Sequence, residues 1–96
     1  MIIVRGVFQA KYGQGGDLVA LFKEARDEWP INYGDRILTD ASGQFFTVVV
    51  ETELESLAAW EHAQAEYLAL PEFGDWFERM THLVESGRRE FYNIES

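Results

Sequence analysis

The chain has 96 residues, 47% hydrophobic and 15% aromatic, values typical of one globular domain spanning residues 1–96. It contains no cysteine, which excludes disulfides, thiolate metal sites and a cysteine nucleophile. A formal net charge of −9 argues against nucleic acid or an acidic membrane surface as a partner. The sequence shows no signal peptide and no apolar run near the roughly 20 residues of a membrane span, so we expect a soluble cytoplasmic protein.

The first part of the chain predicts a strand followed by a helix. Alternating apolar side chains favour a strand from Ile2 to about Tyr12, which the glycine-rich segment 13–16 ends. Asp17 is a good N-cap residue, and apolar residues then recur at helical spacing. Pro30 is expected to stop this helix because proline lacks the N–H that a helix interior needs.

A β-hairpin is expected next, with a short strand around residues 35–40, a turn at residues 41–43 and a strand over residues 44–52. Side chains alternate across a strand. The second strand is expected to place Phe45, Thr47 and Val49 on one face and Phe46, Val48 and Val50 on the other. A half-exposed antiparallel strand alternates apolar with polar residues, so each face of this one needs a cover.

The remaining segments predict a helical region and a final strand. Ser56 is expected to cap a helix, and the helical region is expected to bend or break near Pro71, which suits only the first turn of a continuation. A second apolar stripe runs from Phe73 to Val84 and is expected to close at Gly87. The last strand is placed from Arg88 to about residue 94.

The element order βαββαβ is that of the α+β, ferredoxin-like fold, a four-stranded antiparallel sheet with helices on one face. The helices of one chain can cover only one face of the sheet. Because the third strand is apolar on its other face as well, a second copy of the chain is the simplest cover. We therefore expect a homodimer packed sheet to sheet.

Three segments resemble the dimeric α+β barrel superfamily, which includes NIPSNAP-type proteins and the antibiotic-biosynthesis monooxygenases. They are the opening strand Val4–Phe8 with its glycine-rich turn, the segment Val50–Glu61, and the terminal Arg89–Tyr92. The pattern covers nearly the whole chain, and it concerns element order and aromatic placement. The resemblance implies two ferredoxin-like protomers forming a barrel. Some relatives are cofactor-independent monooxygenases, some degrade haem, some are isomerases, and many have no known role.

His62 is the first candidate ligand-binding residue, because the alanines of its helix stripe leave room beside it. Haem-degrading relatives bind iron through a helix histidine, assisted by a tryptophan on the same helix and an asparagine on the first strand. Here Trp60 precedes His62 by two residues, about 200° around the helix. The first strand carries Gly6 and Gln9 but no asparagine. We therefore expect no haem, metal or other cofactor, and the simplest interpretation of His62 is a surface or partly buried histidine.

Two further patterns have simple structural interpretations. His82 is expected to lie in a solvated ion-pair cluster with Glu78 and Glu85. The segment Gly13–Asp17 invites comparison with a phosphate-binding loop, but it lacks the lysine of a P-loop and the third glycine of the dinucleotide motif. A turn followed by a helix cap accounts for it.

The aromatic residues predict either a packed core or a pocket between sheet and helices. Trp60, Tyr67 and Trp76, with His62, are the candidate ligand-binding residues. Relatives that oxidise flat aromatic substrates bind them beneath the helices. Gly6 leaves a gap on the first strand for a ligand or a large side chain. A pocket larger than about 300 Å³ lined by the three aromatics would favour an enzyme acting on an aromatic substrate over a non-catalytic protein.

Arg5 is expected on the face of the sheet that the partner covers, where a buried guanidinium needs a carboxylate. Glu51 or Glu90 can supply it as an interface ion pair. The alternative is that Arg5 and Gln9 fix an anionic group of a ligand. Arg88 and Arg89 are expected to pair with the surplus of acidic residues.

Two functions remain open on the sequence. The first is a non-catalytic, NIPSNAP-like homodimer that binds a small apolar or aromatic ligand, or none. The second is a cofactor-independent monooxygenase or isomerase acting on an aromatic or quinone-like substrate, in which the protein supplies positioning and a base. The sequence favours the first, because no placed base stands out.

Overall fold

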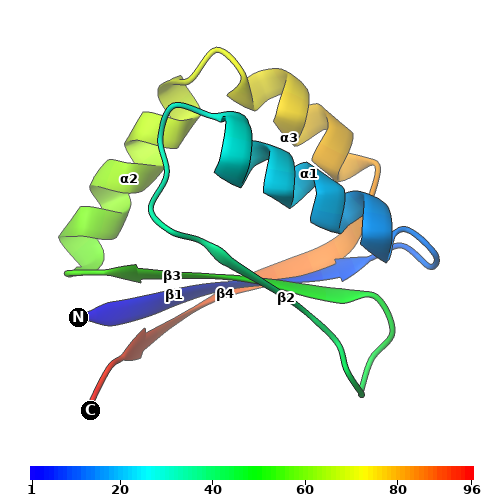
Figure 1. Ribbon diagram of the computed structural model, residues 1–96, viewed down its shortest axis with the longest axis horizontal. Helices are drawn as coiled ribbons and strands as arrows, with labels where there is room; N and C mark the ends of the chain where they lie inside the picture. The colour runs from blue at the N-terminus through cyan, green and yellow to red at the C-terminus, as the bar shows by residue number, and fades with distance from the viewer.

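A four-stranded antiparallel sheet carries three helices on one of its faces and none on the other (Figure 1). The computed structural model describes residues 1–96. In chain order the elements are β1 (Ile2–Ala10), α1 (Gly15–Glu28), β2 (Arg36–Thr39), β3 (Thr47–Leu54), α2 (Leu57–Ala69), α3 (Phe73–Thr81) and β4 (Val84–Asn93). This is the predicted ferredoxin-like order, with the second helical region divided into α2 and α3. None of the three helices has the length and apolarity to cross a membrane.

The strands lie in the order β2-β3-β1-β4, so β1 is central and pairs with both β3 and β4. The register places Val4 opposite Thr52 on one side and opposite Phe91 on the other. Even-numbered residues of β1 therefore share a face with even-numbered residues of β3 and odd-numbered residues of β4. We call this the helix-covered face, because Ala10 and Val48 on it pack into the core formed with the helices.

The main core lies between this face and the helices. Its seven buried residues are Ala10, Leu18, Leu21, Phe22, Trp29, Val48 and Trp76. A smaller cluster of Ile2, Val4 and Leu54 packs against Ala59 and Trp60 at the start of α2. Both clusters gather large apolar side chains under the helices, where their removal from water stabilises the fold.

The hairpin differs from the prediction, because β3 begins at Thr47 rather than at residue 44. The Thr47 N–H donates to Asp40 Oδ1 at 3.0 Å, and the Asp40 N–H donates to Thr47 O at 3.2 Å. These bonds end the ladder and leave Phe45 and Phe46 in the turn, with Phe46 at a φ of +61°. Phe45 is 66% exposed. The predicted apolar character of both strand faces is therefore wrong for these two residues.

The start of α1 also differs from the prediction. Asp17 is not the N-cap: the helix begins at Gly15, and Asp17 lies in its first turn. The Leu18 N–H donates to Gln14 O at 3.0 Å, which starts the helical ladder one turn earlier than expected. A carboxylate in the first turn still favours the helix through its dipole. The predicted stop at Pro30 is confirmed, since Trp29 before it is extended, as residues before proline usually are.

The break in the second helical region is confirmed at Pro71. Ser56 caps α2 as predicted, its hydroxyl accepting from the Ala59 N–H at 3.1 Å. The helix ends at Ala69, and Leu70 is extended at ψ 137° because the proline ring disfavours the α conformation at the residue before it. The chain resumes at Phe73 as α3, and Figure 1 shows α2 and α3 leaning together above the sheet.

The predicted end of the helical region at Gly87 is wrong, because α3 ends at Thr81 and Gly87 lies within β4. The strand begins early because the Lys11 N–H donates to Leu83 O at 2.8 Å and joins β4 to β1. Gly87 instead makes room for a ring, since a Cβ there would lie 3.1 Å from Phe8 Cδ1. A Cβ at Gly6 would lie 2.8 Å from the same ring, which therefore rests over both glycines.

Candidate functional site

A cavity of about 380 Å³ lies between the helix-covered face and the helices. Seventeen of its 22 lining residues are hydrophobic. Three of the four predicted ligand-binding residues, Trp60, Tyr67 and Trp76, line it. The cavity exceeds the size of about 300 Å³ above which the sequence favours an enzyme acting on an aromatic substrate.

Edge-to-face aromatic packing forms the helix side of the cavity. The rings of Trp29 and Trp76 meet at 71° with their centroids 5.2 Å apart, and Trp29 also contacts Tyr67 at 6.1 Å. Trp76 Nε1 donates to Leu21 O at 2.8 Å, which joins α3 to α1 and satisfies a buried polar atom. These contacts hold the rings that line the cavity in fixed positions relative to one another.

Polar groups gather on the β2–β3 side of the cavity. Thr52 donates its hydroxyl proton to Asp35, and Tyr33 donates to Glu66. That hydrogen bond raises the pKa of Tyr33. Burial raises the pKa of Tyr67 strongly, with a further contribution from the negative charge of Asp35, and the Tyr67 hydroxyl makes no hydrogen bond within the chain. The site thus offers a protonated phenol and a carboxylate beside an apolar space.

The β4 side of the cavity carries a single cation. Arg89 lines the cavity, and its guanidinium carbon lies 4.8 Å from the ring centroid of Trp60. Trp60 in turn meets Phe91 edge to face at 5.2 Å. The exposed side chains of Leu68 and Phe77 also line the cavity, so it opens to solvent beside α2 and α3.

His62 lies away from the cavity lining. Its side chain is 77% exposed, and Nε2 lies 3.3 Å from Glu66 Oε1 one helical turn later. The structure therefore brings Trp60, Tyr67 and Trp76 together and leaves His62 on the outer side of α2. No group of three or more histidine, aspartate or glutamate side chains is arranged to hold a metal ion.

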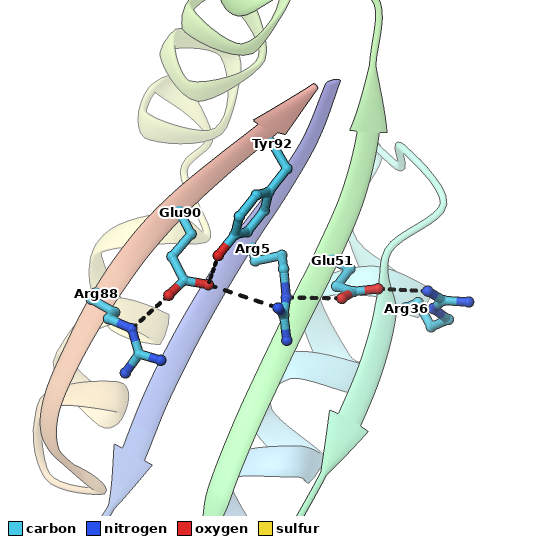
Figure 2. A network of polar contacts seen from close by, with 6 residues as sticks. All are labelled: Arg5, Arg36, Glu51, Arg88, Glu90 and Tyr92. Carbon is cyan, nitrogen blue, oxygen red and sulfur yellow. Dashed lines mark hydrogen bonds and ion pairs between the residues drawn. The ribbon is translucent and has the colours of Figure 1, made fainter. Parts of the chain in front are cut away.

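The face without helices, which we call the open face, carries a row of alternating charges (Figure 2). The charged row consists of one residue from each strand: Arg36, Glu51, Arg5 and Glu90. Arg5 Nε lies 2.9 Å from Glu51 Oε2, an ion-pair distance, although its N–H is not aligned for a hydrogen bond. Arg5 also reaches Glu90 at 3.8 Å. The predicted pairing of Arg5 is confirmed with both carboxylates.

The rest of the network leaves few charges unmatched. Arg36 contacts Glu51 at 2.6 Å, and Arg88 contacts Glu90 at 2.8 Å, as predicted for Arg88. The Arg88 hydrogen bond lowers the pKa of Glu90. The prediction for Arg89 is wrong, because it makes no ion pair and lies on the opposite face.

His82 does not form the predicted ion pairs with Glu78 and Glu85. It is the C-cap residue of α3, and Glu85 already belongs to β4. Because the helix ends at Thr81, the i+3 spacing on which that prediction depended is lost. His82 instead borders a second cavity between α1 and α3.

Sequence reasoning missed five polar residues of the cavity: Tyr33, Asp35, Thr52, Gln64 and Arg89. Tyr33 and Asp35 lie in the irregular segment between α1 and β2, where no periodicity indicates direction. Thr52 and Arg89 could have been assigned to the helix-covered face from strand alternation, once the register of β3 and β4 was known.

Comparison with solved structures identifies the fold. A NIPSNAP domain protein from Burkholderia xenovorans matches with a TM-score of 0.84 at 14% identity, covering 100% of this chain and 96% of that one. A NIPSNAP family protein from Agrobacterium tumefaciens matches with a TM-score of 0.85 at 16% identity, over 99% and 93% of the two chains. The chain has the NIPSNAP fold. The structural resemblance expected from the sequence is thus confirmed.

The antibiotic-biosynthesis monooxygenase branch of the resemblance is found as well. A putative monooxygenase of this kind from Chloroflexus aurantiacus matches with a TM-score of 0.73 at 15% identity, over 99% of this chain and 94% of that one. No protein-family model matches the sequence, and comparison with curated proteins gives no match. At identities this low, the structural matches establish only that the chains share a fold.

The raised pKa of Tyr67 predicts a loss of stability in alkali. The folded chain holds this proton more tightly than the unfolded chain, so the contribution is complete below pH 10 and declines as the pH rises above it. Urea unfolding between pH 8 and 11 should show that the free energy of unfolding falls less steeply in Tyr67→Phe than in the parent. The two slopes should differ by at most about 1.4 kcal/mol per pH unit, and by less after solvent screening. Tyr12→Phe, at a residue 81% exposed, is the control and should follow the parent.

Proposed function

We propose that this protein is a homodimeric NIPSNAP-fold protein that binds a small aromatic ligand between its sheet and helices. The cavity of about 380 Å³ carries the proposal, because its size, apolar lining and few converging polar groups are typical of small-molecule sites. A ligand there would meet the rings of Trp60, Tyr67 and Trp76 and could hydrogen-bond to the Tyr67 hydroxyl or to Asp35.

Specific features of the cavity favour a flat ligand. The ring of Phe8 lies against the backbone at Gly6 and Gly87, so the floor of the cavity there is itself an aromatic ring. The helix side presents aromatic faces and edges, which interact best with another π-system. The opening beside Leu68 and Phe77 is itself apolar and offers an entry route for such a compound.

The open face supports the dimer through its charge balance. The register places three cations, Arg5, Arg36 and Arg88, and three carboxylates, Glu51, Glu53 and Glu90, on this face. The face is therefore neutral although the chain carries −9. Two copies can meet here without placing an excess of one charge in the interface, and the charged row already pairs the groups that a partner would bury. The half-buried side chains of Ile3, Leu38 and Val49 add apolar area around the row.

A second candidate function is the oxidation of a phenol by dioxygen, which the Asp35 carboxylate beside the cavity favours. A phenol bound there would transfer its proton to Asp35, and the electron-rich phenolate would itself reduce dioxygen. For 1-naphthol the products would be 1,4-naphthoquinone and water, with one dioxygen consumed per naphthol. The protein would contribute the base and the position of the ring.

Binding is tested by filling the cavity. Ala63 lines it and is 3% exposed, whereas Ala65 on the same helix is exposed. Isothermal titration calorimetry with 2-naphthol should show binding to the parent and to Ala65→Leu. Ala63→Leu should weaken it at least tenfold, because the added side chain takes the space of the ring. Overpacking can cost about 1–3 kcal/mol, so urea unfolding of each variant serves as the folding control. Unaltered affinity in Ala63→Leu would contradict this site.

The dimer is tested at Val49, at the centre of the open face. Val49→Lys should convert the dimer to monomer in sedimentation velocity, because an unpaired charge in the interface costs several kcal/mol. Ala65→Lys, on the exposed side of α2, is the matched control and should remain dimeric. A parent chain that sediments as a monomer at micromolar concentration would refute the proposed assembly.

Oxidation is tested with an oxygen electrode and 1-naphthol. Uptake by the parent should equal the naphthoquinone formed. Asp35→Asn should reduce it at least tenfold, since asparagine can still accept from Thr52 but is no base. Binding without uptake would leave the ligand-binding function and eliminate the enzymatic one.

A further inference from the structure

Arg89 differs from the other five arginines of the chain. Arg5, Arg26, Arg36, Arg79 and Arg88 each form an ion pair with a carboxylate. Arg89 forms none, although the chain has 17 acidic residues. Its guanidinium lies over the ring of Trp60 and retains its N–H donors for another partner.

The position of Arg89 connects it to the ligand site. It lines the cavity, and the register places it on β4 opposite Gly6 of β1. Gly6 has no side chain, and the ring of Phe8, another lining residue, lies over it. Trp60, which supports the guanidinium, lines the same cavity.

The cavity therefore carries opposite charges on opposite sides. Asp35 and Thr52 lie on the β2–β3 side, and Arg89 lies on the β4 side. Strands in a sheet lie about 4.8 Å apart, so β3 and β4, with β1 between them, are separated by roughly 10 Å. A two-ring aromatic compound with one polar group at each end suits this span. The end at Asp35 would donate a hydrogen bond, and the end at Arg89 would be an anion.

We propose that the ligand is a hydroxylated aromatic carboxylate whose acid group pairs with Arg89 and whose hydroxyl group faces Asp35. This inference rests on the ligand-binding function proposed above and specifies its ligand class. A carboxylate matches the planar guanidinium through two parallel hydrogen bonds. In a chain of net charge −9 an anion is repelled at long range, so a local cation is needed to hold it.

The test compares two ligands that differ only in the acid group, 2-naphthol and 6-hydroxy-2-naphthoate, by isothermal titration calorimetry on the full chain. The parent should bind the naphthoate at least tenfold more tightly than 2-naphthol, with a preference that shrinks as sodium chloride is raised. Arg89→Gln should reduce this ratio towards one, and Arg89→Lys should restore part of it because lysine keeps the charge but loses the planar fork. Circular dichroism and urea unfolding confirm that each variant is folded.

Arg88→Gln is the matched control, because it removes one positive charge from the neighbouring residue of the same strand on the open face. Arg88→Gln should keep the parent's ratio of the affinities for 6-hydroxy-2-naphthoate and 2-naphthol. Equal affinity for the two ligands in the parent, or an unchanged ratio in folded Arg89→Gln, would overturn the role of Arg89 while leaving the ligand site in place. Failure of both ligands to bind the parent would overturn the proposed ligand-binding function and this inference together.

Discussion

The break at Pro71 is the constraint on which the cavity depends. Proline cannot donate the helical hydrogen bond, and its ring forces Leu70 into an extended conformation. One long helix would lie along the sheet and bury a single stripe. Two shorter helices instead lean together above it (Figure 1), and each contributes residues to the cavity lining. The hydrogen bond from Trp76 to Leu21 then fixes α3 against α1 and keeps the space beneath open.

The two faces of the sheet differ in the side chains that they carry. The helix-covered face buries apolar surface but holds Gly6 and Gly87 where Phe8 lies against the backbone, which lowers the floor of the cavity. The open face collects paired charges in a row across all four strands (Figure 2). Ion pairs add little stability on a surface, and they avoid a large penalty only if they stay paired when buried. A neutral row is thus well suited to the sheet-to-sheet assembly we propose.

The proposed ligand class follows from how few polar groups enter an otherwise apolar space. Tyr67, Asp35 and Thr52 stand on one side and Arg89 on the other. A ligand that fails to match the half-buried groups Asp35, Thr52 and Tyr67 leaves them unpaired, which weakens its binding. The same arrangement would supply the base for the oxidation proposed above, since Asp35 would face the acidic hydroxyl of a bound phenol.

The sequence by itself determined the element order, the cap at Ser56 and the breaks at Pro30 and Pro71, because periodicity and local backbone chemistry act over a few residues. The pairing of Arg5 could also be predicted, because a buried guanidinium needs a carboxylate. Only the tertiary structure decided that Phe45 and Phe46 lie in a turn, that Gly87 belongs to a strand, and which aromatics enclose space rather than fill it. It also separated Arg89 from Arg88, which face opposite sides of the same strand. Those outcomes depend on strand register and on contacts between distant segments, which no local pattern encodes.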